Sequence, residues 1–334
     1  MQDWFSEGDK FAILGVNVAL HDGLERSGLP GGLVAVPNDA FELPSHWIEW
    51  LGSHQVKGIK ECNLYVLANM RSATPNILDA ESQILQRRVG HWYHGLLLSK
   101  KLREYSEPFI LSGGKLERAV DVRSFSILIP SASTIVLDDS EITIDALKRA
   151  AKIAEQLETF QGPWQSHHWR FSRCLAIYLE ARTKNDILDR IHQFTRCIEG
   201  LILPEQGNTK KQFKSRTELF VGPRHHDLMG EVYDVRSDIE HLHEYKHLVT
   251  FNREKRIRLA GLEAKTEWIA RSCLERIVLD PQLLKHFGSV SSLQAFWAKP
   301  GDERRVIWGE PIDPYTCLAG FNSAHVDDAQ LGAR

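Results

Sequence analysis

One stretch of the sequence, Glu231–Leu248, carries an arginine and a histidine that could act on a phosphate ester. Its apolar residues recur at helical spacing and form one stripe, made of Val232, Val235, Ile239 and Leu242. At about 100° per residue, Arg236 lies to one side of this stripe and His241 to the other. Arginine offers phosphate oxygens a planar fork of donors, and histidine can exchange a proton near neutral pH. The stretch therefore predicts an amphipathic helix whose polar face could do phosphate chemistry.

Further polar side chains lie on the arc between Arg236 and His241, namely Tyr233, Ser237, Glu240 and Glu244. Ser237 could orient the arginine or bind phosphate, or it could be an ordinary polar surface residue. Tyr233 could stack a base or pack at the edge of the apolar stripe. Glu240 could support the site, or it could pair with Arg236 on a solvated helix face.

The residues around this helix resemble a known family, which gives the arginine–histidine pair more meaning than its loose spacing. That spacing also occurs at Arg88 and His94. The run YDVRSDIEH, however, resembles the signature helix of HEPN domains, in particular the Apea-like branch. Upstream, Arg190–Gly207 resembles the first long helix of the family, and Lys210–Gly222 resembles its short helix. The resemblance covers roughly residues 186–280, and Leu242 stands where the family usually has glycine.

The resemblance implies a metal-independent endoribonuclease that works without a cofactor, with His241 as general base or acid and Arg236 stabilising the charge on phosphorus. It also implies a toxin or phage-defence effector, with a regulatory partner protein. The family builds its sites at homodimer interfaces, and the residues here agree. Arg236 and His241 point about 140° apart on an ideal helix, so one copy does not easily bring both to one phosphate. Two copies across a two-fold axis can.

A second interpretation is a non-catalytic HEPN module for dimerisation or for binding nucleotides or RNA. Leu242 and the modest basic charge favour this alternative, whereas Arg236 and His241 on a polar face favour the enzyme. Basic residues upstream of the signature could follow an RNA backbone beside Phe213, or they could form a solvated face. They are Lys210, Lys211, Lys214 and Arg216.

Composition sets broad limits on the chain. It has 334 residues, 43% of them hydrophobic and 25% charged, as in soluble globular proteins. Residues 1–142 hold 13 basic and 18 acidic side chains, and residues 143–300 hold 25 and 20. The mildly basic middle is compatible with an anionic partner, and equally with ordinary variation. No apolar run could span a bilayer, and no signal-peptide pattern opens the chain, so we expect a cytoplasmic protein without a membrane partner. The five cysteines form no C-x-x-C pair, so we expect free thiols and no metal site.

The pattern predicts an α+β protein with a strand-rich N-terminal domain (residues 1–142) that senses or positions something. An all-α, HEPN-type helical bundle (143–299) and a C-terminal tail (300–334) follow. The runs expected to form strands are short and rich in apolar residues, namely Phe11–Leu20, Gly31–Pro37, Asn63–Met70, Trp92–Ser99, Phe109–Gly114 and Glu117–Pro130. His91 and His94 flank Trp92 and Tyr93, and we interpret this cluster as a half-buried sheet face rather than a metal site.

Overall fold

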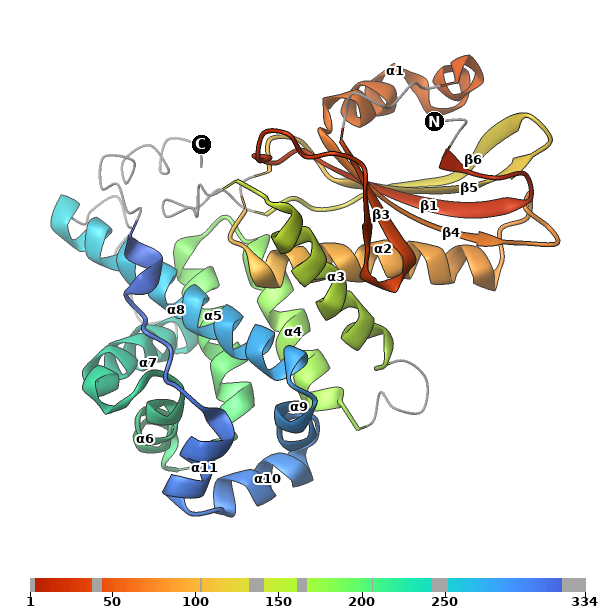
Figure 1. Ribbon diagram of the computed structural model, residues 1–334. Coiled ribbons are helices and arrows are strands. Elements are labelled where there is room, and N and C mark those ends of the chain that lie inside the picture. Colours follow the sequence, from red (N-terminus) through yellow and green to blue (C-terminus); the bar gives the residue numbers. More distant parts are fainter. Residues whose placement is uncertain are drawn as a thin grey trace. The chain divides into compact units, whose positions relative to one another are not determined.

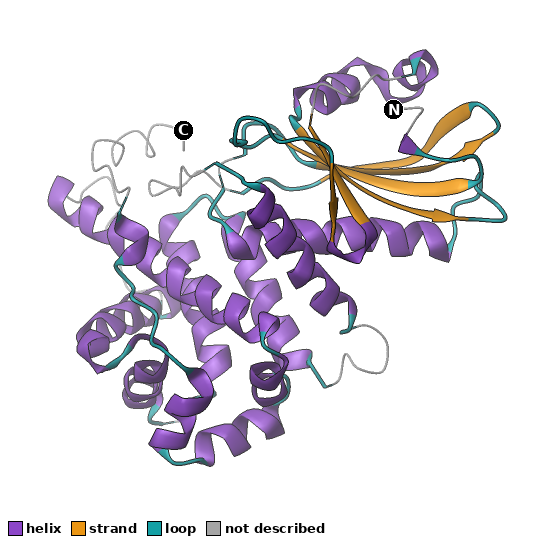
Figure 2. Ribbon diagram, in the orientation of Figure 1, coloured by secondary structure: helices purple, strands orange, loops and turns teal. Residues whose placement is uncertain are grey.

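The chain is an α+β protein with two compact units. The computed structural model describes residues 4–37, 44–102, 104–131, 141–160, 167–205, 207–241 and 252–319. The first unit comprises Met1–Ser131 with Asp139–Glu158, and the second comprises Ala132–Asp138 with Thr159–Arg334. Strands are confined to the first unit within the described residues, and the second is helical (Figure 1, Figure 2). Among the described helices, none is long and apolar enough to cross a membrane.

The first unit is built on an antiparallel sheet with the strand order β2-β3-β4-β1-β5-β6. Its strands are β1 (Asp9–Val16), β2 (Ser27–Leu29), β3 (Leu33–Pro37), β4 (Leu64–Arg71), β5 (Phe109–Leu116) and β6 (Ala119–Ile127). Every residue of β1 is buried, because α1 (Ser45–Glu61) and α2 (Ala80–Ser99) cover opposite faces of the sheet (Figure 1). Five of the six predicted strand runs overlap these strands.

The sixth run, Trp92–Ser99, is not a strand but the second half of α2, so that prediction was wrong. Asp79 caps this helix by accepting hydrogen bonds from the backbone amides of Glu81 and Ser82. The helix packs on β1, β4 and β5 and buries its apolar run against the sheet. A short apolar run is compatible with a buried strand or a buried helix, and its periodicity cannot separate the two.

The helix α3 (Ile144–Glu158) belongs to the first unit, although its sequence placed it in the helical bundle. The Nε1 of Trp92 donates to the carbonyl oxygen of Leu147 at 3.3 Å. Gly95 lets the two helices approach closely, because a Cβ at this position would lie 2.3 Å from the carbonyl oxygen of Ala150. The boundary between the units therefore follows α3, near residue 158, instead of preceding it at 142.

The second unit contains eight α-helices in its described parts. They are α4 (Trp169–Arg182), α5 (Ile187–Ile202), α6 (Thr209–Val221), α7 (His226–Glu240), α8 (Arg253–Leu279), α9 (Pro281–Phe287), α10 (Val290–Ala298) and α11 (Gly301–Trp308). The α5 helix is central, since it contacts α4, α6, α7, α8 and α10. Its apolar face includes the fully buried Ile191, Cys197 and Leu201.

The segment predicted as a C-terminal tail contains a helix within its described residues, 300–319. The helix α11 lies within this segment and buries Trp308 against Phe220, with ring centroids 4.6 Å apart. Acidic residues in its first turn and an arginine in its last turn suit the helix dipole. A 3-10 turn, Thr316–Leu318, follows, and the final residues, 320–334, lie outside the described part of the chain.

Candidate functional site

The helix that carries Arg236 begins earlier than its sequence suggested. Gly222, with φ at +83°, ends α6, and a 3-10 turn (Pro223–His225) leads into α7 at His226. The described helix ends at Glu240, with His241 as its C-terminal cap. Residues 242–251 lie outside the described part of the chain. They include Glu244 and also Leu242, which stands where the HEPN family usually has glycine.

The apolar stripe of α7 packs as expected over its described length. Val232 and Val235 are buried and Ile239 is half-buried. The helix lies against α5 and α6. This packing fixes the rotation of α7 about its axis and turns Arg236 toward α5.

Arg236 is held between two carboxylates from two helices. Its Nη2 lies 3.3 Å from an Oε2 of Glu199 on α5 and 3.9 Å from that of Glu240 one turn further along α7. The guanidinium carbon sits 5.9 Å from the centroid of the Tyr233 ring. The arginine side chain is only 19% exposed and that of Glu199 only 12%. The Arg236 guanidinium is therefore held in place by two carboxylates of the same chain.

Burial shapes the electrostatics of this pair. It raises the pKa of the Glu199 carboxyl, although the positive charge of Arg236 opposes the rise. The Nε of Arg236 and the Oε1 of Glu199 are both buried, and each lacks a hydrogen-bond partner among the described atoms. Buried polar atoms usually have a hydrogen-bond partner, either in the protein or in ordered water.

A second histidine, His192 on α5, joins the cluster formed by Arg236, Glu199 and Glu240. Its Nε2 lies 2.5 Å from an Oε2 of Glu240, and this hydrogen bond lowers the pKa of the Glu240 carboxyl. The imidazole, the carboxylate and the guanidinium therefore form a continuous chain from His192 through Glu240 to Arg236. Sequence reasoning missed both His192 and Glu199.

A signal for these residues existed in the spacing along α5. His192, Arg196 and Glu199 follow one another at intervals of four and three residues, so they share one face of the helix. That face meets α7. The charged stripe on this helix, which neighbours the signature helix, was therefore the sequence signal for His192 and Glu199.

His241 and Ser237 lie at the C-terminal end of α7. The backbone amide of His241 donates to the carbonyl oxygen of Ser237 at 3.0 Å, and the histidine is exposed while Ser237 is half-buried. Arg236 is directed at α5, whereas His241 stands at the exposed end of the helix. The structure therefore brings Tyr233, Arg236 and Glu240 together and places His241 beyond them.

The basic residues of α6 have different partners. Lys210 pairs with Asp234 at 2.6 Å, and Lys214 lies 3.8 Å from Asp227. Lys211 is exposed. Arg216 donates to the carbonyl oxygens at the end of α5 instead.

Phe213, which could have stacked a base between these lysines, is fully buried. Its ring lies 5.4 Å from that of Tyr233, centroid to centroid. These two rings pack α6 against α7, so Phe213 belongs to the core and not to a binding surface.

Comparison with family models, with curated proteins and with solved structures found no match to this chain. The HEPN resemblance therefore stays a prediction that rests on its own residues. In the described part of the chain, no group of three or more histidine, cysteine or acidic side chains is arranged to hold a metal ion. Arg236 can stabilise negative charge, and the imidazoles of His192 and His241 can exchange protons.

Proposed function

We propose that the protein is a metal-independent endoribonuclease of the HEPN type. The 2′-hydroxyl oxygen of a ribose attacks the adjacent phosphorus, and the bond from phosphorus to the 5′-oxygen of the next nucleotide breaks. The products are a 2′,3′-cyclic phosphate and a 5′-hydroxyl. His241 takes the proton of the attacking hydroxyl or returns one to the leaving oxygen, and Arg236 stabilises the extra negative charge on the phosphate oxygens.

The observation that supports this proposal is the setting of Arg236. Glu199 and Glu240 fix its guanidinium at the polar end of α7, one turn before the exposed His241. A fixed guanidinium stabilises a developing charge without reorganising at the moment of reaction. The chain His192–Glu240–Arg236 makes His192 a positioning residue in the proposal, because it reaches the arginine only through Glu240.

The proposal includes a homodimer through the helical unit. Since Arg236 is directed at α5 and His241 stands at the helix end, we place the arginine of one copy near the histidine of the other. It also includes a cytoplasmic role as a toxin or phage-defence effector whose cleavage a regulatory partner protein restrains.

The test is incubation of the purified protein with labelled RNA in excess EDTA. Arg236→Ala should lower the cleavage rate about 10²–10³-fold and His241→Ala about 10²–10⁴-fold, with cyclic-phosphate ends on the wild-type products. Both variants should remain folded by circular dichroism. Cleavage that survives in both folded variants would move the site elsewhere.

A non-catalytic module that binds RNA or nucleotides is the second candidate, and one observation favours it. Glu199 and Glu240 neutralise much of the charge that Arg236 would otherwise offer to phosphate. RNA binding without cleavage, even with the trigger or partner present, would support this candidate. In that case Arg236→Ala should weaken binding, because a charge-assisted contact to phosphate is lost.

A further inference from the structure

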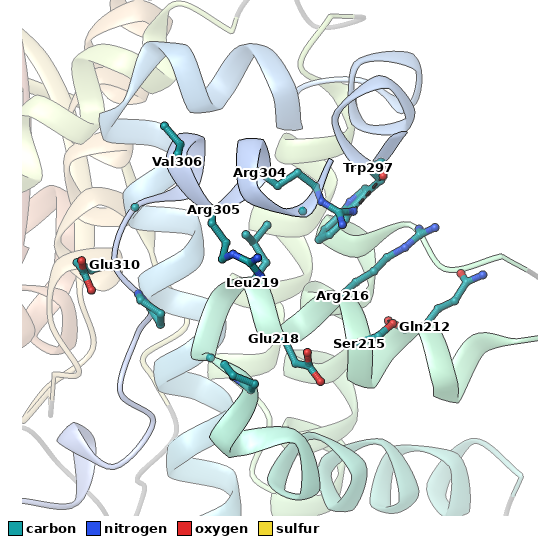
Figure 3. Close-up of a pocket in the computed structure, with 15 residues that line it drawn as sticks. Gln212, Ser215, Arg216, Glu218, Leu219, Trp297, Arg304, Arg305, Val306 and Glu310 are labelled. Atoms are coloured by element: carbon teal, nitrogen blue, oxygen red, sulfur yellow. Dashed lines mark hydrogen bonds between the residues drawn. The ribbon is translucent and has the colours of Figure 1, made fainter. Parts of the chain in front are cut away.

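A cavity of about 860 Å³ lies in the helical unit, lined by residues of α6, α10 and α11 (Figure 3). Arg236, His241, Glu199 and His192 are not among its lining residues, so it is separate from the candidate site. Its volume falls within the range of about 300–1,000 Å³ that is usual for pockets that hold small ligands. Its most distinctive feature is three arginines, which are Arg216, Arg304 and Arg305.

Two of these arginines are anchored on one tryptophan. The guanidinium carbons of Arg216 and Arg304 lie 5.4 Å and 5.1 Å from the ring of Trp297. Trp297 is itself fixed, since it is 9% exposed and its Nε1 donates to the carbonyl oxygen of Leu201 at 3.2 Å. The Nη1 of Arg304 donates to the carbonyl oxygen of Trp297 at 3.0 Å. The two positive groups are therefore held in place before any ligand arrives.

The third arginine joins them at the start of α11. A Cβ added to Gly301 would lie 3.8 Å from the Nη2 of Arg304 and 4.0 Å from the Nη2 of Arg305. Gly301 is the first residue of that helix, whose first-turn backbone amides have no acceptor within the helix. Figure 3 shows these side chains lying between α11 and α6.

The acidic residues nearby do not neutralise the whole group. Arg305 pairs with Asp302, and Arg216 lies 3.4 Å from Glu205. Two carboxylates also line the cavity, those of Glu218 and Glu310, and Glu218 pairs with His226. Arg304 has no carboxylate partner among the described residues. Burial, together with the like charges of Arg216 and Arg305, lowers the pKa of Arg304.

We propose that this cavity binds a small phosphate-bearing ligand with two or more negative charges, of the size of a nucleoside diphosphate. Arg304 and Arg305 bind the phosphate oxygens beside the first turn of α11, and Arg216 contributes positive charge from α6. The remaining volume, lined in part by Leu219 and Pro311, accommodates the organic portion.

The direct test measures binding of pyrophosphate and of adenosine diphosphate to the full chain by calorimetry, at constant ionic strength. A 10-mer oligoribonucleotide is the third probe. Wild type should bind at least one of the two small phosphates saturably, and Arg304→Gln should weaken that binding about 10- to 100-fold, as expected for a lost charge-assisted hydrogen bond. RNA cleavage is not a readout here, so the result is independent of the proposed ribonuclease activity.

A matched pair of variants keeps the test valid if Arg304→Gln folds poorly. Gly301→Asp places a carboxylate where the phosphate should lie, so it should raise the thermal midpoint of the free protein and abolish binding of the small phosphates. Gly301→Asn has the same shape without the charge, so it should weaken binding of the small phosphates less than Gly301→Asp does. Equal binding by wild type and Gly301→Asp would overturn the proposal. So would binding of the oligoribonucleotide alone, or binding of none of the three probes.

Discussion

Arg236 and Glu199 form an almost enclosed ion pair, and this predicts a strong energetic coupling between them. Glu199→Gln and Arg236→Gln should each lower the free energy of unfolding by about 1–3 kcal/mol. Each substitution removes one charge of the pair and leaves the other charge buried without its counter-charge. The double variant should lose less than the sum, with a coupling of about 0.5–3 kcal/mol. Urea denaturation of the four proteins measures it.

The exposed pair formed by Lys184 and Glu180 on α4 provides the control, since its nitrogen–oxygen distance of 3.2 Å is similar. Glu180→Gln should change the free energy of unfolding by less than about 0.5 kcal/mol. Additive losses at Glu199 and Arg236 would show that the two side chains do not depend on each other.

His192 should behave as a positioning residue and not as the proton carrier. His192→Gln removes the imidazole that holds Glu240, so the arginine loses one constraint, and the cleavage rate should fall about tenfold. The pH dependence of the remaining activity should keep its shape, because His241 still exchanges the proton. His226→Gln, which breaks a histidine–glutamate pair between α6 and α7, is the matched control and should leave the rate unchanged. A changed pH profile in His192→Gln would make His192 the proton carrier.

His94 should make the first unit sensitive to acid. Burial, together with the neighbouring His91, lowers the pKa of His94 to about 4, whereas its ordinary value is 6.5. A lowered pKa means that the fold favours the neutral imidazole. The stabilisation is therefore fully present above pH 6.5 and is lost as the pH falls from 6.5 toward 4.

The measurement compares the urea midpoint of wild type and His94→Leu across this range. The wild-type midpoint should fall more steeply than that of the variant below pH 6.5, because leucine does not titrate. His91, Glu158 and Arg87 act on the same region and remain in both proteins. The exposed His54 is the control, so His54→Leu should follow the wild-type curve. Parallel curves for wild type and His94→Leu would contradict the prediction.

At the scale of elements, α2 and α3 should depend on the absence of one side chain. Gly95→Ala places a Cβ 2.3 Å from the carbonyl oxygen of Ala150, so α3 must move away. The expected loss in the free energy of unfolding is about 1–3 kcal/mol, as for other overpacked sites. Gly90→Ala on the same helix meets only a side-chain methyl at 3.7 Å, and it should be neutral or stabilising by up to about 1 kcal/mol. Equal effects of the two substitutions would show that α3 does not pack there.

Sequence patterns predicted the elements that have one apolar face and one polar face. The stripe of α7 is local, so it could be read from neighbouring residues. The second half of α2 was mistaken for a strand because it is buried without a clear period. The polar face of α5 had a readable spacing, but its role depends on which helix packs against it. Such contacts are set by tertiary packing and not by local pattern.

At the scale of the whole molecule, the proposed site needs two chains. Light scattering at micromolar concentration should give twice the chain mass of 38.1 kDa. The reason is that Arg236 and His241 diverge within one copy, so a complete site requires a second. A monomer at this concentration, together with full ribonuclease activity, would exclude the shared site. The boundary between the two units could be predicted only in part. The α3 helix is amphipathic, and its sequence does not indicate which unit it belongs to.

One arginine of the cavity, Arg216, also forms hydrogen bonds with the C-terminal end of α5, the helix that carries Glu199 and His192. Arg216 donates to the carbonyl oxygens of Ile202 and Leu203, at 2.8 Å and 2.5 Å, where α5 ends with Leu203 in the left-handed conformation. Glu199, the partner of Arg236, lies in the same last turn. An anion in the cavity that accepts hydrogen bonds from Arg216 would compete with those carbonyls and loosen that turn. By thermodynamic reciprocity, a second ligand that loosens the turn would raise the affinity for the anion by the factor by which the anion raises the affinity for that ligand. The small ligand would then be an effector, and the end of α5 would carry its signal to Arg236.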